Sequence, residues 1–475
     1  MTTLPDGFRV RVRDDVRRLP SADGAVLLVG GSPLRALRLA APAAALLRSE
    51  TVAVADRSSE VVVRRLLDGN LADPAGLEPA PAAELTVVVP VKDRSAELDR
   101  CLAALAGLPV VVVDDGSQEP AAVAGVARRH GARLVALPVN RGPAAARNAG
   151  LACVETPFVA FVDSDVDVSP VVLLGLAGHF ADPRVALAGP HVRGRSRSER
   201  PPWFERYDEQ ASSLALGSRA CSVAPGAAVG WLPSACLVGR TAVLRDPSVD
   251  GFAETLRVGE DVDLVWRLVA AGHVVRYDPA HEAFHDARGT VRGWLGRKLV
   301  YGSGGAELGR RHGDAIAPAI LSPAMALAAA AVLLRRRWSP FVAVGAVVWG
   351  GRTVAEALPA APGRRRTAAR LAVRGLGWGV RQESALLLRH WWPGVAVSAL
   401  GSRGVRRAVG TALVIDSAVA IGQQPQANPA VTLLGRRLDD LAYGAGLWLG
   451  ALRRRDAQCL RPVLVRRGRS RRRAG

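Results

Sequence analysis

The sequence predicts an α/β protein whose largest part is a doubly wound sheet. From Leu85 onward, short apolar runs alternate with amphipathic helical stretches, as strands and helices do in βαβ units. The runs are rich in valine, which is typical of strands that are buried on both faces. Several of them end in acidic residues, at the edge where open α/β sheets bind their ligands. These observations together place the functional site at that edge.

The length and composition limit what the chain can be. Its 475 residues suffice for about two to four domains. The formal net charge is +20, which suits nucleic acid, anionic lipid or an anionic substrate as a partner. The five cysteines are scattered without a C-x-x-C pair, which predicts reduced thiols instead of a disulfide frame or a zinc site. No secretory signal is visible at the amino terminus.

Residues 1–80 are predicted to form a small winged-helix-like lobe. The runs FRVRV and AVLLVGG suggest a hairpin. Two helices follow, the first with Ser32 as its cap and Pro33 at its first position, the second ended by Gly69 and Asn70. The GGSP turn and the RRLLDGNLADP ending resemble the peptide-chaperone domain of ribosomal-peptide maturation systems. An ordinary small α+β lobe is the alternative.

Residues 84–312 are predicted to form the α/β domain. Its strands are LTVVVPV, PVVVVDDGS, ARLVALP and FVAFVDSD, and the helices between them begin at SAELDRC, AAVAGVA and PAAARNAG. Parallel strands joined by such crossover helices end at the same edge of a sheet. The acidic residues at the strand ends are therefore expected to converge on one cleft.

Four side chains follow successive strand ends or lead into the next strand. Asp93 follows the first strand, Asp115 ends the second, Arg147 lies on the helix before the fourth, and Asp163 follows the fourth. A carboxylate accepts from the N–H edge of a base, and an arginine neutralises a diphosphate. Asp163 and Asp165 alternate along an extended segment and so share one face, which suits Mg²⁺ or Mn²⁺ carrying a phosphorylated substrate.

The later part of this domain offers a group of aromatic side chains and a further carboxylate. The arginine-rich stretch that contains Trp203, Phe204 and Tyr207 is predicted to be a mobile loop, whose aromatic rings either stack on a ligand or anchor the loop to the sheet. Asp261, in VGEDVDLVWRLVAAGH, opens a helix whose positive amino end favours a carboxylate. By itself such a carboxylate is a helix cap, but together with the preceding motifs Asp261 is well placed to take a proton from a hydroxyl group.

Residues 313–475 are predicted to be helical, rich in alanine and arginine. The stretch 315–334 has no charged residue and is long enough to span a bilayer, although its alanines and two prolines make insertion marginal. A helical region on the membrane surface and a soluble Ala-rich bundle are the two alternatives. The basic flanks and the RRGRSRRRAG tail favour contact with anionic lipid.

In their order and approximate spacing, the segments VVVPVKDR, VVVDDGS, NRGPAAARNAG, FVDSDV and VGEDVDLVWRLVAAGH resemble the inverting glycosyltransferases of family 2. The resemblance covers residues 85–275 and implies a mixed sheet of the GT-A type. It also implies that Asp93 and Asp115 bind the uridine end of a UDP-sugar, with Arg147 near the base or phosphates. Asp261 would be the general base.

The same resemblance implies a Mn²⁺ or Mg²⁺ ion held by Asp163, Asp165 and His285. Arg297 would bind the donor diphosphate from a closing loop. Asp167 has no counterpart in the family pattern and is interpreted as a solvated carboxylate. One displacement at the anomeric carbon inverts its configuration, so an α-linked donor would give a β-glycoside.

The whole layout resembles the glycosyltransferases of mycofactocin biosynthesis in actinobacteria. This implies transfer of a hexose, glucose, onto a small peptide-derived redox cofactor precursor at the cytoplasmic face of the membrane, with peripheral attachment or one or two marginal helices. One alternative is a glycosyltransferase for cell-envelope polysaccharide or glycolipid. Another is a basic membrane- or nucleic-acid-binding protein without catalysis. We expect no nucleic-acid partner, because the arginines are dispersed and the carboxylates cluster in loops.

Overall fold

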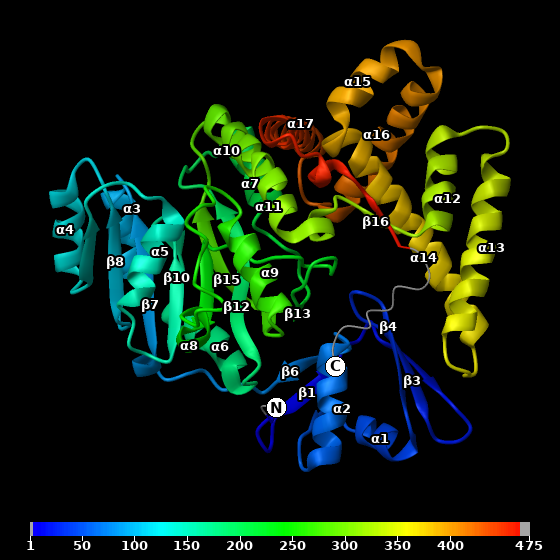
Figure 1. Cartoon of the computed structure of the whole chain (residues 1–475), viewed down its shortest axis with the longest axis horizontal. Helices are drawn as coiled ribbons and strands as arrows, with labels where there is room; N and C mark the ends of the chain where they lie inside the picture. The colour runs from blue at the N-terminus through cyan, green and yellow to red at the C-terminus, as the bar shows by residue number, and fades with distance from the viewer. Residues whose placement is uncertain (1–2, 466–475) are drawn as a thin grey trace. The chain divides into compact units, whose positions relative to one another are not determined.

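Figure 1 shows the computed structural model, which describes residues 3–465. These residues form two compact units, one of residues 3–18 and 22–288 and the other of residues 19–21 and 289–465. The predicted division into domains 1–80, 84–312 and 313–475 stays a prediction.

The lobe at the start of the chain has its own small core. Val10, Leu28, Val63, Leu66 and Leu71 are all buried in it. Strand β1 pairs antiparallel with β5 and β6, and β3 pairs antiparallel with β4. The elements of the lobe are β1 (Arg9–Val12), β2 (Arg17–Pro20), β3 (Val26–Gly30), β4 (Arg35–Leu39), α1 (Ala41–Ala45), β5 (Thr51–Ala53), α2 (Arg57–Asp68) and β6 (Ala72–Ala75).

The first predicted helix of the lobe is wrong over its first half. Residues Arg35–Leu39 form β4, and α1 covers only Ala41–Ala45. The alternation of Arg35, Leu37 and Leu39 fits a hairpin with β3, which puts Leu39 into the core. The second helix is confirmed as α2. It ends at Asp68, and Asn70 follows in the left-handed region at φ 55°.

The larger part of this unit is built on one mixed sheet of nine strands. Its order is β11-β15-β12-β14-β10-β7-β8-β9, and β13 pairs with β15. Strands β10, β7, β8 and β9 run parallel, whereas β14 is antiparallel to β10 and β12. The strands are β7 (Leu85–Val91), β8 (Val110–Asp115), β9 (Arg133–Leu137), β10 (Phe158–Val162), β11 (Val166–Asp167), β12 (Val185–Arg195), β13 (Cys221–Ser222), β14 (Cys236–Arg240) and β15 (Val274–Asp286).

Helices cover both faces of this sheet, which confirms the predicted doubly wound α/β arrangement. A Cβ at Gly150 of α5 would meet Val88 and Val113, so α5 packs on the face of these side chains. Val87 and Val112 belong to the core cluster that also holds Leu98 and Leu102 of α3, and alternate strand residues point to opposite faces. The helices are α3 (Ser95–Ala104), α4 (Pro120–Arg129), α5 (Pro143–Ala152), α6 (Pro170–Ala177), α7 (Trp203–Ala211), α8 (Thr241–Leu244) and α9 (Glu260–Ala270).

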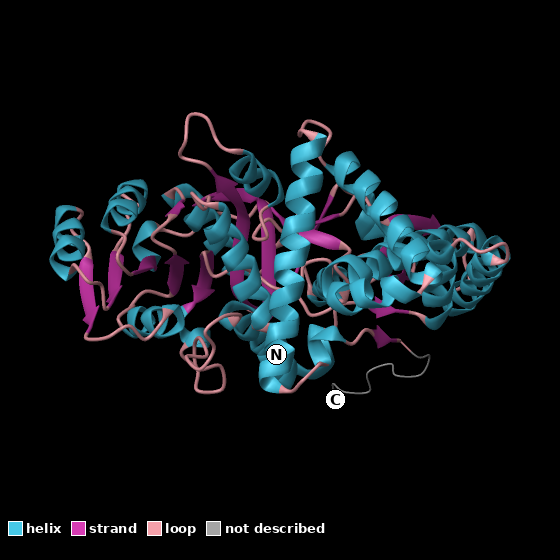
Figure 2. Cartoon of the chain, turned by 90° about the horizontal axis from the view of Figure 1, so that it is seen from above, coloured by secondary structure: helices cyan, strands magenta, loops and turns pink. Residues whose placement is uncertain are grey.

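The second unit is mostly helical, as Figure 2 shows by its colouring. Helices α10 and α17 pack closely because glycine allows their backbones to approach. A Cβ at Gly446 would lie 2.0 Å from the carbonyl oxygen of Leu299, and one at Gly302 would lie 2.1 Å from that of Tyr443. Lys298 of α10 is buried and pairs with Asp439 of α17 at 2.7 Å. The helices are α10 (Val291–Ser303), α11 (Gly305–His312), α12 (Pro323–Leu334), α13 (Ser339–Ala357), α14 (Arg364–Ala385), α15 (Trp392–Gly401), α16 (Arg403–Gln423) and α17 (Pro429–Arg454).

The apolar stretch 315–334 does not form one helix. Residues Ile320–Leu321 form strand β16, which pairs in parallel with β17 (Val463–Leu464). Helix α12 then begins at Pro323, with Ser322 as its cap, and has 12 residues. A proline at the first helical position is favourable, but it does not allow the helix to extend backward through it. Within residues 3–465, no helix combines the length and apolarity needed to cross a membrane.

Candidate active site

The acidic residues predicted from the sequence lie at one edge of the sheet. Strands β10, β7 and β8 are parallel neighbours, so their carboxyl ends meet there. Asp93 follows β7, Asp115 ends β8 and Asp163 follows β10. The fold thus brings three separate segments of the sequence to one edge.

Asp93 and Asp115 organise the loops at this edge. Asp93 adopts φ 56°, accepts a hydrogen bond from the N–H of Gln118 at 2.6 Å and stays exposed. Asp115 is buried, and its two oxygens accept from the N–H groups of Arg141 at 2.7 Å and Gly142 at 2.9 Å. The Asp115 carboxylate therefore shapes the loop that leads into α5.

Arg147 is an internal bridge between two elements. It is 2% exposed, and its Nη2 donates to Asp163 Oδ1 at 2.6 Å while its Nη1 donates to Glu260 Oε1 at 3.0 Å. Its guanidinium also lies 5.4 Å from the ring centre of Phe252. Burial alone would lower the pKa of Arg147, but the Asp163 and Glu260 carboxylates outweigh it and raise that pKa above its ordinary value. Arg147 thus ties the end of β10 to the start of α9.

Asp165 is the most enclosed carboxylate of the strand-end segment. Its side chain is 6% exposed and accepts a short hydrogen bond from Arg94, with Arg288 Nη2 at 3.5 Å. His285 Nε2 lies 3.6 Å from Asp165 Oδ1, because β11 pairs with β15 and sets these segments side by side. Asp165 and His285 are therefore brought together, as the sequence predicts.

The donor atoms present fit a divalent cation held by few protein ligands. Carboxylate oxygen and imidazole nitrogen both bind Mn²⁺, and Mg²⁺ is usually held by one or two carboxylates plus substrate phosphates. Asp165 and His285 supply such a pair. Both carboxylates of this segment also have arginine partners, Arg147 at Asp163 and Arg94 with Arg288 at Asp165. No cluster of three or more His, Cys, Asp or Glu side chains with metal-site geometry occurs in the part of the chain that the structure describes.

Asp167 is not the solvated carboxylate that was expected. It accepts hydrogen bonds from Arg195 Nη1 at 3.0 Å and Arg197 Nη2 at 2.7 Å, and its side chain is only 23% exposed. Strand β12 carries Arg195 beside β15, which places these arginines over the segment that contains Asp167. The sequence places these arginines in a loop and so gives no signal for this pairing.

Asp261 is the second residue of α9 and is partly buried. Its Oδ1 accepts from the N–H of Val262 at 2.8 Å and its Oδ2 from the N–H of Ser234 at 3.2 Å. Burial, and then the negative charge of Glu260, raise the pKa of Asp261 to about 7. A carboxyl group with such a pKa is suited to proton transfer near neutral pH.

Two further predictions concern aromatic residues that precede α9 in the sequence and an arginine that follows it. Phe204 and Tyr207 are buried in α7, which packs against β12, so these two aromatic rings anchor the segment as the second interpretation held. Arg297 belongs to α10 in the second unit, where its guanidinium lies 5.6 Å from the ring centre of Tyr301. Its role toward a donor stays a prediction.

Several contacts within the site escaped the sequence-based prediction. Glu260 binds Arg147, Arg94 and Arg288 bind Asp165, and the backbone N–H of Ser234 binds Asp261. Arg94 and Glu260 are direct neighbours of predicted residues, and this adjacency was the only available signal. Their partners lie 71 and 113 residues away in the sequence, a separation that local patterns do not bridge.

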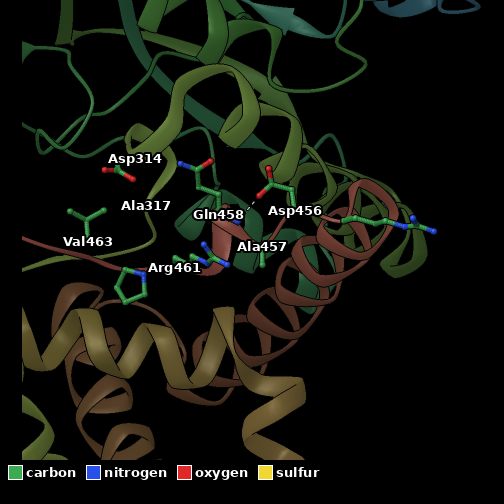
Figure 3. A pocket seen from close by; sticks show the side chains of 9 residues that line it. Asp314, Ala317, Asp456, Ala457, Gln458, Arg461 and Val463 are labelled. Atoms are coloured by element: carbon green, nitrogen blue, oxygen red, sulfur yellow. Dashed lines mark hydrogen bonds between the residues drawn. The ribbon is translucent and has the colours of Figure 1, made fainter.

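A separate hollow of about 490 Å³ lies within the second unit (Figure 3). The N–H of Gln458 donates to Asp456 Oδ1 at 2.8 Å beside it. None of the predicted site residues lines this hollow. The lining residues are Asp314, Ala317, Arg455, Asp456, Ala457, Gln458, Arg461, Pro462 and Val463.

Comparisons with known proteins identify relatives along the whole chain. Residues 86–225 match Glycosyl transferase family 2, and residues 158–375 match Glycosyl transferase family group 2. The chain is 40% identical over 472 residues to the pre-mycofactocin glycosyltransferase of Mycobacterium tuberculosis, covering 98% of this chain and 99% of the relative. It is 30% identical to an N-acetylglucosaminyltransferase of Mesorhizobium japonicum, covering 44% of this chain and 52% of that protein.

Among solved structures, a mannosyltransferase from Pyrobaculum calidifontis in complex with GDP-Man and Mn²⁺ is similar with a TM-score of 0.41. Its sequence is 16% identical, and the match covers 80% of this chain and 94% of that chain.

Proposed function

The chain belongs to glycosyltransferase family 2, and from this premise we propose that it is an inverting enzyme that transfers glucose from UDP-glucose to a hydroxyl group. The predicted α/β fold of the GT-A type is confirmed by the family match and the mixed sheet. We propose that the acceptor is a small peptide-derived precursor of mycofactocin. This choice rests on the 40% identity to the pre-mycofactocin glycosyltransferase, which extends over 98% of the chain. The alternative acceptors, cell-envelope polysaccharide or glycolipid, are less well supported because the N-acetylglucosaminyltransferase matches less than half of this chain.

Asp261 is proposed as the general base of this reaction. The acceptor oxygen forms a bond to the anomeric carbon, the bond from that carbon to the diphosphate oxygen breaks, and the acceptor proton moves to a carboxylate oxygen of Asp261. The backbone N–H groups of Val262 and Ser234 orient that carboxylate. A single displacement of this kind converts an α-linked donor into a β-glycoside.

Asp93 and Asp115 are proposed to line the uridine side of the donor, and Asp163 and Arg297 its diphosphate side. Arg147 is proposed to act on the donor through Asp163, which it binds, because its guanidinium is buried. Asp165 and His285, with Asp163, would hold Mn²⁺ or Mg²⁺, which neutralises charge on the departing diphosphate when bound. Arg94 and Arg288 balance the negative charge of Asp165.

We also propose that the enzyme works at the cytoplasmic face of the membrane as a peripheral protein. The net charge of +20 supports contact with anionic lipid. The lobe of residues 1–80 is proposed to take part in recognition of the peptide-derived acceptor, on the basis of its resemblance to peptide-chaperone domains.

The experiment that tests the proposed function measures UDP release and product formation together. Purified protein with Mn²⁺ is incubated with UDP-glucose and a small-molecule extract that contains the aglycone precursor, and hexose addition is followed by mass spectrometry. We expect UDP release and a product heavier by one hexose. Absence of UDP release with every UDP-sugar would contradict the enzymatic proposal, and release without hexose addition to the precursor would contradict the acceptor.

A further inference from the structure

Helix α13 is apolar on two opposite faces. Its inner face packs on α12 and α14: Ala346 is buried, and a Cβ at Gly350 would lie 2.8 Å from the Cε atom of Met325. A helix of a water-facing bundle normally carries polar residues on the face opposite to its packed face. Helix α13 departs from this pattern.

The other face of α13 exposes large apolar side chains. Phe341, Val344, Val348 and Trp349 are 79%, 63%, 49% and 59% exposed, and their spacing of three or four residues puts them on one side of the helix. We call these four residues the outer stripe of α13. A contiguous exposed apolar surface of this kind is typical of a binding face.

The surroundings of the outer stripe are strongly basic. Residues 315–382 contain ten arginines and one acidic residue, Glu356. The exposed run Arg335–Arg337 precedes α13, and exposed Arg352 follows the stripe along the same side of the helix. Trp338 and Trp349, which are both exposed, lie near the two ends of the stripe. Apolar stripes bounded by tryptophan and arginine are typical of helices that lie in a membrane interface.

We propose that the outer stripe of α13 docks in the headgroup region of an anionic bilayer, with the helix axis along the membrane plane. This inference rests on the proposed membrane association and assigns it to one helix face. Arg352 and Glu356 lie in the last turns of α13, which argues against insertion across the bilayer.

A second copy of the chain fits this face less well than anionic lipid does. A two-fold symmetric contact would set one outer stripe against another and bring both sets of flanking arginines together. Their mutual repulsion opposes such a dimer, whereas lipid phosphates attract the same arginines. Charge complementarity therefore favours an anionic bilayer over a second copy of the chain as the partner of the outer stripe.

The test compares vesicle binding of the full-length protein and two variants. The double variant Phe341→Gln with Val348→Gln makes the outer stripe polar with a residue that favours helix. Val171→Gln, at a 75% exposed valine of α6, is the matched control. Each protein is sedimented with vesicles of phosphatidylcholine alone or mixed with phosphatidylglycerol. Circular dichroism melting checks that all three proteins fold alike.

We expect the wild-type protein and V171Q to bind the phosphatidylglycerol vesicles and the double variant to bind about tenfold more weakly. Quenching of tryptophan fluorescence by brominated lipid should weaken in parallel. Equal binding of all three proteins would overturn the outer stripe as the docking face while leaving membrane association in place.

Two other results would also overturn the proposal. If the wild-type protein does not bind the anionic vesicles, membrane association fails with it, although UDP release by the same sample would still support the transferase. If sedimentation velocity without vesicles shows a wild-type dimer that the double variant lacks, the occupant of the stripe is a second copy.

Discussion

Asp261 and Glu260 are adjacent carboxylates whose surroundings differ. Glu260 Oε1 accepts a hydrogen bond from Arg147 Nη1 at 3.0 Å, whereas the Asp261 carboxylate accepts hydrogen bonds from two backbone N–H groups. Burial and the charge of Glu260 therefore raise the pKa of Asp261 to about 7. Of two neighbouring carboxyl groups, Glu260 thus pairs with an arginine, and Asp261 is the one suited to accept a proton.

The rate of transfer should therefore depend on pH through Asp261. Below pH 7 the base becomes protonated, so kcat/KM is expected to fall by about tenfold per pH unit. Asp261→Asn should lower transfer by about 10²–10⁴-fold and leave the Kd for UDP-sugar nearly unchanged. Asp14→Asn, at an exposed carboxylate, is the control. Loss of donor binding in D261N would make Asp261 a donor ligand and not the base.

The same pKa shift predicts how D261N changes stability with pH. Because the folded-state pKa of Asp261 is above the ordinary 3.8, the folded protein holds this proton more tightly than the unfolded chain. The stability that the folded protein gains from binding this proton is fully present below pH 3.8 and is lost as the pH rises to about 7. D261N removes this loss, so its Tm relative to wild type should be higher at pH 8 than at pH 4. A constant Tm difference across this range would contradict the raised pKa.

The pair of Arg147 and Glu260 should couple strongly. Arg147→Met leaves the buried Glu260 without its guanidinium and is expected to lower the free energy of unfolding by about 3–5 kcal/mol. Glu260→Gln should cost less, because Arg147 keeps Asp163 as a partner. A double-mutant cycle by urea denaturation should give a coupling energy of about 1.5–3 kcal/mol. The exposed pair Arg11 and Glu50, which are 2.9 Å apart, is the control and should couple by less than about 1 kcal/mol. Equal coupling energies in the two cycles would contradict a buried bridge.

At the scale of elements, the strands of the large sheet were predictable and two helical segments were not. A continuous apolar run such as LTVVVPV predicts a strand that is buried on both faces, whatever its neighbours are. Strands β7, β8 and β10 could therefore be predicted from the local sequence. Residues 35–39 fit a helix locally but are recruited by β3 into a hairpin. Residues 315–334 are interrupted because β17 lies more than a hundred residues further on and pairs with β16. In both cases the secondary structure of a segment is decided by the strand that pairs with it, and the segment's own sequence does not reveal that strand.

In the candidate site, too, some residues could be predicted from local sequence and others could not. Its carboxylates could be predicted because each follows a recognisable strand, and their shared edge follows from parallel pairing. The arginines that balance them were not predictable, because Arg288 and Arg195 reach Asp165 and Asp167 only through the pairing of β15 with β11 and β12.

The packing of α10 on α17 should be sensitive to a single methyl group. Gly446→Ala would place a Cβ 2.0 Å from the carbonyl oxygen of Leu299, so the helices must separate. We expect a loss of about 1–3 kcal/mol in the free energy of unfolding. Gly422→Ala, in α16 where a Cβ meets no atom within 4 Å, should instead stabilise by up to about 1 kcal/mol. Thermal melting of both variants checks this contrast, and a G446A variant as stable as G422A would contradict the close approach.

At the scale of the whole molecule, the lobe is joined to the large sheet by a few buried polar contacts. Arg276 of β15 is 2% exposed and binds Asp73 of β6 at 2.9 Å and Ser222 Oγ at 2.9 Å. Asn70 donates to the carbonyl of Ser222 at 3.2 Å and accepts from its N–H at 2.9 Å. These contacts hold the lobe against β13 and β15 within the first unit.

Removal of Arg276 should therefore loosen the lobe selectively. Arg276→Met leaves Asp73 with the more distant guanidinium of Arg13, at 3.7 Å, and is expected to cost about 2–4 kcal/mol in the free energy of unfolding. Limited proteolysis should then cut the linker near residues 76–84 faster than in the wild-type protein. Arg38→Met, which removes a half-exposed pair with Asp23, is the control and should leave the cutting rate unchanged. An unchanged cutting rate in R276M would show that other contacts hold the lobe.

The scarcity of lysine gives the molecule a practical property. The sequence contains two lysines, and Lys298 is buried against Asp439. Lys92 is 42% exposed and lies 3.9 Å from Asp93 at the edge of the sheet. An amine-reactive fluorophore would therefore label the native protein at Lys92 and at the terminal amine. The folded chain thus carries a nearly unique chemical handle beside the carboxylates at the edge of its sheet, where a dye would test the proposed binding of a nucleotide.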